Sequence, residues 1–175
     1  MSANSKPIRL SGTGCCLVDE IFTGIDFSAP AMNAYLSVTP GDGGLTPGQL
    51  VFSEEFERFS GQDIHEVLNA FTGGRSPDVI NIGGPSIVAL IHCAQLLQES
   101  DSEVRFYGIT GADEEGQFIR DRLSETPVHI AAWKRSKKRT ASTIVLSDPD
   151  YDDGHGERMF INTIGAAGDL VPEDL

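Results

Sequence analysis

The chain has 175 residues, 39% of them apolar and 22% charged, which is typical of a globular protein with one domain or one domain and part of another. A formal net charge of −13 repels phosphate backbones and anionic lipids, so we expect neither nucleic acid nor a membrane surface as a partner. No apolar run approaches the ~20 residues that span a bilayer, and the N-terminus lacks the apolar core of a secretory signal, so we expect a cytoplasmic protein.

The predicted elements alternate between strands and helices along the chain. Apolar runs predict strands over 8–22, 78–84, 104–110, 128–133, 140–147 and 158–161. Helical periodicity and caps predict helices from Asp63 to the glycine pair at 73–74, over 85–97, from Asp113 onward, and opening at Pro172. Such alternation predicts an α/β fold whose parallel sheet is covered by helices on both faces.

A long stretch over 24–62 interrupts this plan and is rich in Gly, Pro and Ser. Within it, 35–38 and 49–52 are predicted as short strands on either side of a turn that contains Gly43 and Gly44. Irregular stretches of this length are uncommon unless they have a function, so the pattern predicts a lid.

Two nucleotide-binding motifs can be tested on the sequence, and both fail. The run 111–116 has the glycine spacing of a P-loop, but Gln117 and Phe118 stand where Lys and Ser or Thr are required. We therefore expect Asp113 in this run to cap a helix. A dinucleotide fingerprint starting at Gly12 would need a third glycine where Leu17 stands, which disfavours a nicotinamide-dependent oxidoreductase.

Two charged clusters are candidates for a metal or an anion site. The acidic run 148–154 resembles a calcium loop, but its glycine falls one place late and Met159 replaces the final Glu, so we expect no metal site. The basic cluster KRSKKR over 134–139 predicts a solvated turn between two strands. The alternative is that one of its charges lies over an anionic substrate.

Asp19 and the pair Gly83–Gly84 lie toward the carboxyl ends of predicted strands, at the sheet edge where α/β folds bind ligands. A carboxylate there can accept hydrogen bonds from hydroxyl groups, although a simple strand-end cap remains the alternative for Asp19. The two glycines allow a ligand to approach the backbone, and Pro85 then begins a helix whose N-terminus favours negative charge.

An ordered set of segments now resembles the ribokinase-like (PfkB) family of carbohydrate kinases. The segments are GTGCCLVD (12–19), GGLTPG (43–48), INIGGPSIVAL (80–90), GITGADEEG (108–116), GERMF (156–160) and GAAGDLVPEDL (165–175). The resemblance covers nearly the whole chain, and it is specific as an ordered set rather than in any one segment. It implies a ribokinase-like parallel sheet with a small β-sheet lid, and transfer of the γ-phosphoryl group of ATP to a sugar hydroxyl.

The resemblance also implies roles for individual residues. Asp19 matches the aspartate that holds substrate hydroxyls, and Gly83 and Gly84 match the glycine pair beneath the substrate. The family's catalytic GAGD turn lies later in the chain than the turn ending in Asp169. That turn also has one residue too many, so we expect Asp169 to be a loop or cap residue.

The sequence therefore predicts the N-terminal, substrate-binding and lid part of an ATP-dependent sugar kinase, truncated before the catalytic base. The expected core is 8–22 and 63–175, and the expected lid is 24–62 with strands from 128–161 as further contributors. ATP and Mg²⁺ are expected mostly on the part that is absent, so no catalytic residue is assigned and this stretch alone is expected to be inactive. The alternative is a non-catalytic module that binds a sugar, or that forms homo-oligomers through its lid strands.

Overall fold

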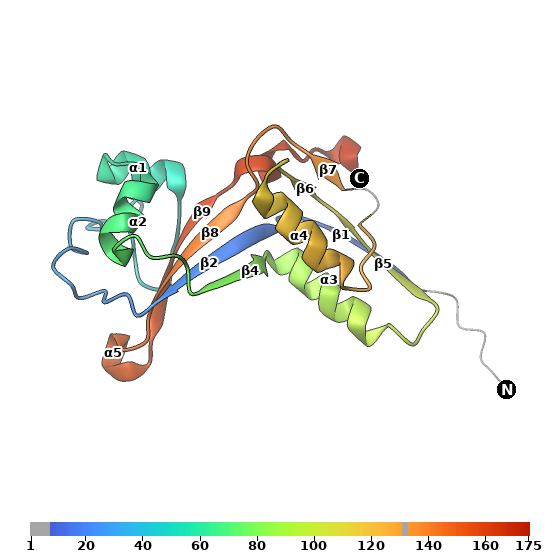
Figure 1. Cartoon of the computed structure of the whole chain (residues 1–175), viewed down its shortest axis with the longest axis horizontal. Coiled ribbons are helices and arrows are strands. Elements are labelled where there is room, and N and C mark those ends of the chain that lie inside the picture. The colour runs from blue at the N-terminus through green and yellow to red at the C-terminus, as the bar shows by residue number, and fades with distance from the viewer. Residues whose placement is uncertain (1–7, 131–132) are drawn as a thin grey trace. The chain divides into compact units, whose positions relative to one another are not determined.

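A computed structural model describes residues 8–130 and 133–175 (Figure 1). Its strands are β1 (Ile8–Thr13), β2 (Leu17–Thr23), β3 (Leu50–Phe52), β4 (Val79–Gly83), β5 (Ser102–Tyr107), β6 (Ile109–Thr110), β7 (Lys134–Arg135), β8 (Ser142–Asp148) and β9 (Glu157–Thr163). Its helices are α1 (Ser53–Ser60), α2 (Ile64–Thr72), α3 (Pro85–Leu96), α4 (Glu114–Ser124) and α5 (Tyr151–Gly154), followed by the 3₁₀ helices η1 (Gly165–Asp169) and η2 (Pro172–Asp174). The expected α/β class is confirmed.

The chain folds into two compact units, which are described separately. The first contains residues up to Val18, Ile82–Ala141 and Ile164–Leu175, and the second contains Asp19–Asn81 and Ser142–Thr163. No helix in the described part of the chain is long and apolar enough to span a membrane.

The first unit is built on the parallel pair β1 and β5, in register from Ile8 opposite Ser102 to Thr13 opposite Tyr107. Alternate residues of a strand share one face, so the buried side chains of Val104 and Phe106 point together into the core. There they join a cluster with apolar residues of α3 and α4, namely Ile87, Leu90, Ile119 and Leu123. Both helices therefore cover the same face of β5 (Figure 1).

The second unit is built on a sheet with the strand order β3-β9-β8-β2-β4. β3 runs parallel to β9, whereas β8 and β9 form an antiparallel pair from Ser142 opposite Thr163 to Asp148 opposite Glu157. The core of this unit contains Phe22, Phe56, Val67, Leu146 and Met159, which come from strands of the sheet and from α1 and α2.

The capped helices agree with the sequence prediction because their end signals are local. Asp63 accepts a hydrogen bond from the backbone N–H of His65 at the start of α2, and Gly73 ends that helix with φ of 64°. Pro85 occupies the first turn of α3. Asp113 caps α4 by accepting from the N–H of Gly116 at 2.9 Å.

Four predicted strands differ from the structure. The strand predicted over 104–110 is divided into β5 and β6. The single strand over 8–22 is divided at Gly14, whose φ of 146° breaks the extended run into β1 and β2. The strand predicted over 35–38 is reduced to an isolated bridge between Leu36 and Leu45. Of the strand predicted over 128–133, residues 131–132 lie outside the described part, and His129 forms only a bridge with Arg105.

Burial differs most at β4. The apolar run over 78–84 predicts a buried strand, yet β4 is an edge strand on which Val79 and Ile80 are 47% and 50% exposed. The prediction is wrong because burial depends on what covers a strand, and no local pattern specifies that. α1 is also absent from the sequence prediction, since its N-cap, Phe52, provides no side-chain cap.

Candidate functional site

Asp19 is the third of the seven residues of β2 and not at the end of a strand as the sequence predicts, and its carboxylate is half-buried. Burial raises the pKa of this carboxyl, and a hydrogen bond with the buried Thr143 side chain on β8 offsets part of that rise. The side chain is therefore held within the second unit with its charge partly removed from water. A carboxylate in this state gains more than a solvated one from hydroxyl donors that approach it.

Asn162 on β9 extends the polar group formed by Asp19 and Thr143. Thr143 and Asn162 are directly opposite each other in the antiparallel pair, so their side chains share one face of the sheet. The Oδ1 atom of Asn162 is buried, and it has no hydrogen-bond partner among the described residues. Sequence analysis missed both residues because only the register of β8 against β9 brings them together.

Gly83 and Gly84 belong to the first unit, where β4 ends and α3 begins. Gly84 has φ of 109°, and a Cβ atom at this position would collide with the backbone carbonyl of Cys15. The hydroxyl of Ser86, in the first turn of α3, donates to the carbonyl of Thr13 at 2.8 Å. Only glycine therefore fits at position 84, where the backbone passes closest to the turn before β2.

The turn at Gly43 and Gly44 is tightly packed in the second unit. A Cβ at Gly43 would lie 2.7 Å from the carbonyl of Glu55, and one at Gly44 would lie 2.6 Å from the backbone of Ser37. Backbone N–H groups, including that of Gly44, donate to Asp42 and lower the pKa of its carboxyl. The two glycines also line a cavity of about 320 Å³.

Asp169 lies in the first unit and faces the basic turn over 134–139. Its carboxylate accepts a hydrogen bond from Lys138 Nζ at 2.6 Å and another from the Ser136 hydroxyl at 2.5 Å. The hydrogen bond from Lys138, followed by that from Ser136, lowers the pKa of this carboxyl. A carboxylate with two such donors and a lowered pKa is a weak proton acceptor.

Asp113 makes the P-loop-like run unsuitable for phosphate. Its carboxylate accepts from the N–H of Thr140 at 2.7 Å and from the Thr140 hydroxyl, in addition to capping α4. These bonds lower its pKa against the opposing effect of burial, which keeps negative charge where a phosphate would have to lie.

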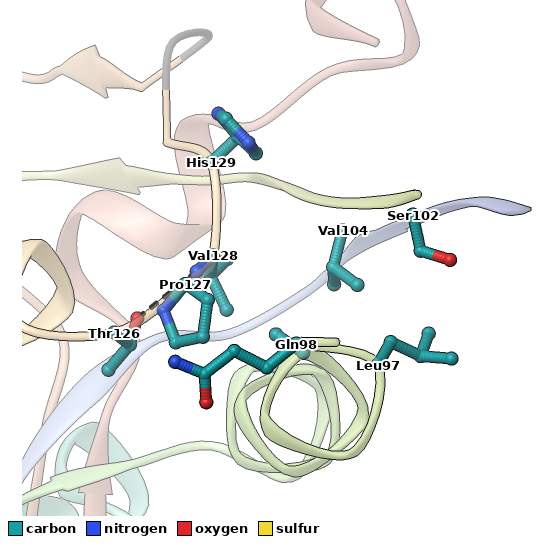
Figure 2. Close-up of a pocket in the computed structure, with 9 residues that line it drawn as sticks. Leu97, Gln98, Ser102, Val104, Thr126, Pro127, Val128 and His129 are labelled. Carbon is teal, nitrogen blue, oxygen red and sulfur yellow. Dashed lines mark hydrogen bonds between the residues drawn. The ribbon is translucent and has the colours of Figure 1, made fainter. Parts of the chain in front are cut away.

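A further cavity of about 380 Å³ lies in the first unit, between the end of α3, the start of β5 and residues 126–129 (Figure 2). Its lining combines apolar side chains such as Leu97 and Val104 with polar ones such as Gln98. The Thr126 hydroxyl, at its rim, accepts a hydrogen bond from the N–H of Val128 at 3.4 Å. All five predicted site residues lie elsewhere.

The chain was compared with known proteins. No protein-family model matches it, and no curated protein matches its sequence. Solved structures match it well. An adenosine kinase from Anopheles gambiae, in complex with P1,P4-di(adenosine-5) tetraphosphate, gives a TM-score of 0.66 at 20% identity. A probable sugar kinase from Rhizobium etli gives 0.64 at 20%, and a ribokinase from Giardia lamblia gives 0.56 at 19%.

These matches cover 95%, 96% and 95% of this chain in the same order. They cover only 44%, 42% and 37% of the respective kinases, so the chain spans less than half of their length. Likeness at this level of identity establishes the fold and nothing finer. The fold is ribokinase-like, as the ordered sequence segments predict, and the structural neighbours are adenosine and sugar kinases.

Proposed function

We propose that this chain forms the acceptor-binding part of an ATP-dependent sugar kinase. The observation that carries the proposal is the half-buried carboxylate of Asp19 on a strand of a ribokinase-like fold, supported by the hydroxyl of Thr143. Phosphoryl transfer depends on positioned charges and on an acceptor hydroxyl held in place. Asp19 would accept hydrogen bonds from sugar hydroxyls that flank the reacting one.

The glycines would have two separate roles. Gly83 and Gly84 would let the acceptor approach the backbone, at a junction where the positive φ of Gly84 also favours glycine. The turn at Gly43 and Gly44 would belong to a lid that excludes water from the reacting groups. We retain 24–62 as the lid, and the pairing of β3 with β9 supports a contribution from the strands of 128–161.

The described residues do not fit Mg²⁺-ATP. The run 111–116 places the carboxylate of Asp113 where a phosphate would have to bind. The carboxylate of Asp169 already accepts a hydrogen bond from Lys138. We therefore assign no catalytic residue, and we infer that the base and most ATP and Mg²⁺ contacts come from outside these 175 residues. ATP-dependent chemistry fits the cytoplasm, where we place the protein.

An alternative function is a non-catalytic module that binds a sugar or assembles with another copy. The exposed edge strand β4 favours assembly, because an unpaired edge is a surface on which another strand can pair. The two functions differ in whether ATP is consumed.

The test is ADP release by the longest natural protein that contains this chain, measured with aldoses, ketoses and adenosine as acceptors. Our proposal predicts release that depends on one sugar, and no turnover by the 175-residue chain alone. ADP release that depends on adenosine and on no sugar would show that the acceptor is a nucleoside rather than a sugar. Saturable sugar binding without ADP release would favour the non-catalytic module.

A further inference from the structure

Arg120 and Arg135 lie close together in the first unit, around the hydroxyl of Thr110. Arg120 projects from α4, and its Nη1 donates to the buried Thr110 Oγ1 at 2.8 Å. Arg135 belongs to β7, which pairs with β6 so that Arg135 is directly opposite Thr110. Neighbouring strand residues in register share a face, so the Arg135 side chain is on the same side of the pair as the Thr110 hydroxyl.

Neither arginine has a carboxylate partner. No acidic oxygen of the described residues lies within 4.0 Å of a side-chain nitrogen of Arg120 or Arg135.

The neighbouring cations of the basic turn are mostly paired. Lys134 is bonded to Asp174, Lys138 to Asp169 at 2.6 Å, and Arg139 to Glu115 at 2.8 Å. The structure therefore neutralises three positive charges of the turn and leaves those of Arg135 and Lys137 without a carboxylate partner among the described residues.

The acids closest to Arg120 are occupied by other donors. Asp121 accepts from Gln117 Nε2 at 2.6 Å, and Asp113 accepts from Thr140 and Gly116. Arg120 Nη2 donates to Gln117 Oε1 at 3.0 Å, and only the buried Nε atom has no hydrogen-bond partner among the described residues. Burial and then the charge of Arg135 lower the pKa of Arg120, and the charges of Asp121 and Asp113 oppose this shift only in part.

We propose that Arg120 and Arg135 form a phosphate-binding site, distinct from the acceptor site, for inorganic phosphate or a phosphate monoester. Guanidinium groups bind phosphate oxygens with paired, charge-assisted hydrogen bonds. A dianion would cancel the repulsion between the two arginines. It would also supply an acceptor for Arg135, whose side chain is exposed and free to reach it.

Trp133 provides a direct readout. It is the only tryptophan of the chain, and its Nε1 donates to the same Thr110 Oγ1 at 3.0 Å. The experiment titrates inorganic phosphate, and separately methyl phosphate, into the 175-residue chain at constant ionic strength while tryptophan emission is followed. We expect a saturable change in emission with both compounds and no change with acetate. The relative affinity for the two compounds distinguishes a site for the free phosphate ion from a site for a phosphate ester.

Two variants separate a site from general electrostatics. Arg135→Gln should weaken phosphate binding by about 10-fold or more, since a charge-assisted contact is lost. Lys137→Gln removes the same charge from the same exposed turn and should leave the affinity within about 2-fold, since exposed charges are screened. Circular dichroism checks that both variants are folded. The absence of a saturable change, an equal response to acetate, or an equal loss in both variants would overturn the proposal.

Discussion

At the scale of single residues, Asp19 is under opposing demands from stability and binding. Its carboxyl pKa is higher in the folded chain than the ordinary value of 3.8, because burial disfavours the charge. The folded state therefore binds more protons than the unfolded state between these two pKa values. The contribution of Asp19 to the free energy of unfolding consequently falls as the pH rises through that interval.

Asp19→Asn should accordingly unfold at a higher urea concentration than the wild type at about pH 7, with a difference that disappears near pH 3. The amide keeps an oxygen that can accept from Thr143 but removes the buried charge. Asp101→Asn, at an exposed aspartate of the other unit, is the matched control and should change little. A variant less stable than the wild type at pH 7 would show that our account of the Asp19 environment is wrong.

Asp169→Ala should leave kcat of the full-length kinase nearly unchanged, because Lys138 and Ser136 already occupy this carboxylate. Loss of a general base typically lowers the rate by roughly 10²- to 10⁴-fold, which is far outside the effect expected here. The measurement is kcat together with the folded fraction by circular dichroism. A fall beyond about 100-fold in a folded variant would make Asp169 catalytic after all.

At the scale of elements, the junction of β4 and α3 depends on Gly84. Gly84→Ala should lower the free energy of unfolding by about 3 kcal/mol or more, the sum of a positive-φ penalty and a clash with the Cys15 carbonyl. Gly24→Ala is the control, since Gly24 has φ of 67° with nothing within 4 Å, and it should lose only about 1 kcal/mol. Equal losses in urea unfolding would remove the clash from the explanation.

The elements that the sequence predicts correctly are those with local signals. α2 and α4 have aspartate caps, and α3 has Pro85 at its start, so their positions follow from neighbouring residues alone. α1 has no capping side chain, and only Ser53 and Phe56 of it are buried, which leaves little periodicity to detect. The exposure of β4 depends on the rest of the fold, and a local pattern cannot specify it.

At the scale of the whole molecule, the isolated chain should self-associate through the edge strand β4. Val79 and Ile80 expose large apolar side chains on a strand at the edge of the described sheet. Light scattering should show a molecular mass that rises with protein concentration, and Ile80→Lys should reduce this rise. Leu96→Lys alters a residue that is 86% exposed on a helix and should have a smaller effect. A stable wild-type monomer at high concentration would contradict the prediction.

The candidate site was predictable only in part. Asp19, Gly83 and Gly84 could be proposed because the sequence pattern places them toward the ends of predicted strands, and these assignments stay predictions. Thr143 and Asn162 could not be found, because the contact of Thr143 with Asp19 and its pairing with Asn162 depend on strand register rather than on sequence spacing. The acceptor itself is not encoded in any local motif, so it has to be identified by experiment.

The central claim is that Asp19 holds the hydroxyl groups of a sugar acceptor. Isothermal titration calorimetry of the sugar identified by the ADP-release screen, with full-length wild type and Asp19→Asn, tests it most directly. Loss of a charge-assisted hydrogen bond costs about 1.5–3 kcal/mol, so the variant should bind roughly 10- to 150-fold more weakly, while Asp101→Asn binds normally. An unchanged affinity in the folded Asp19→Asn variant would contradict the account.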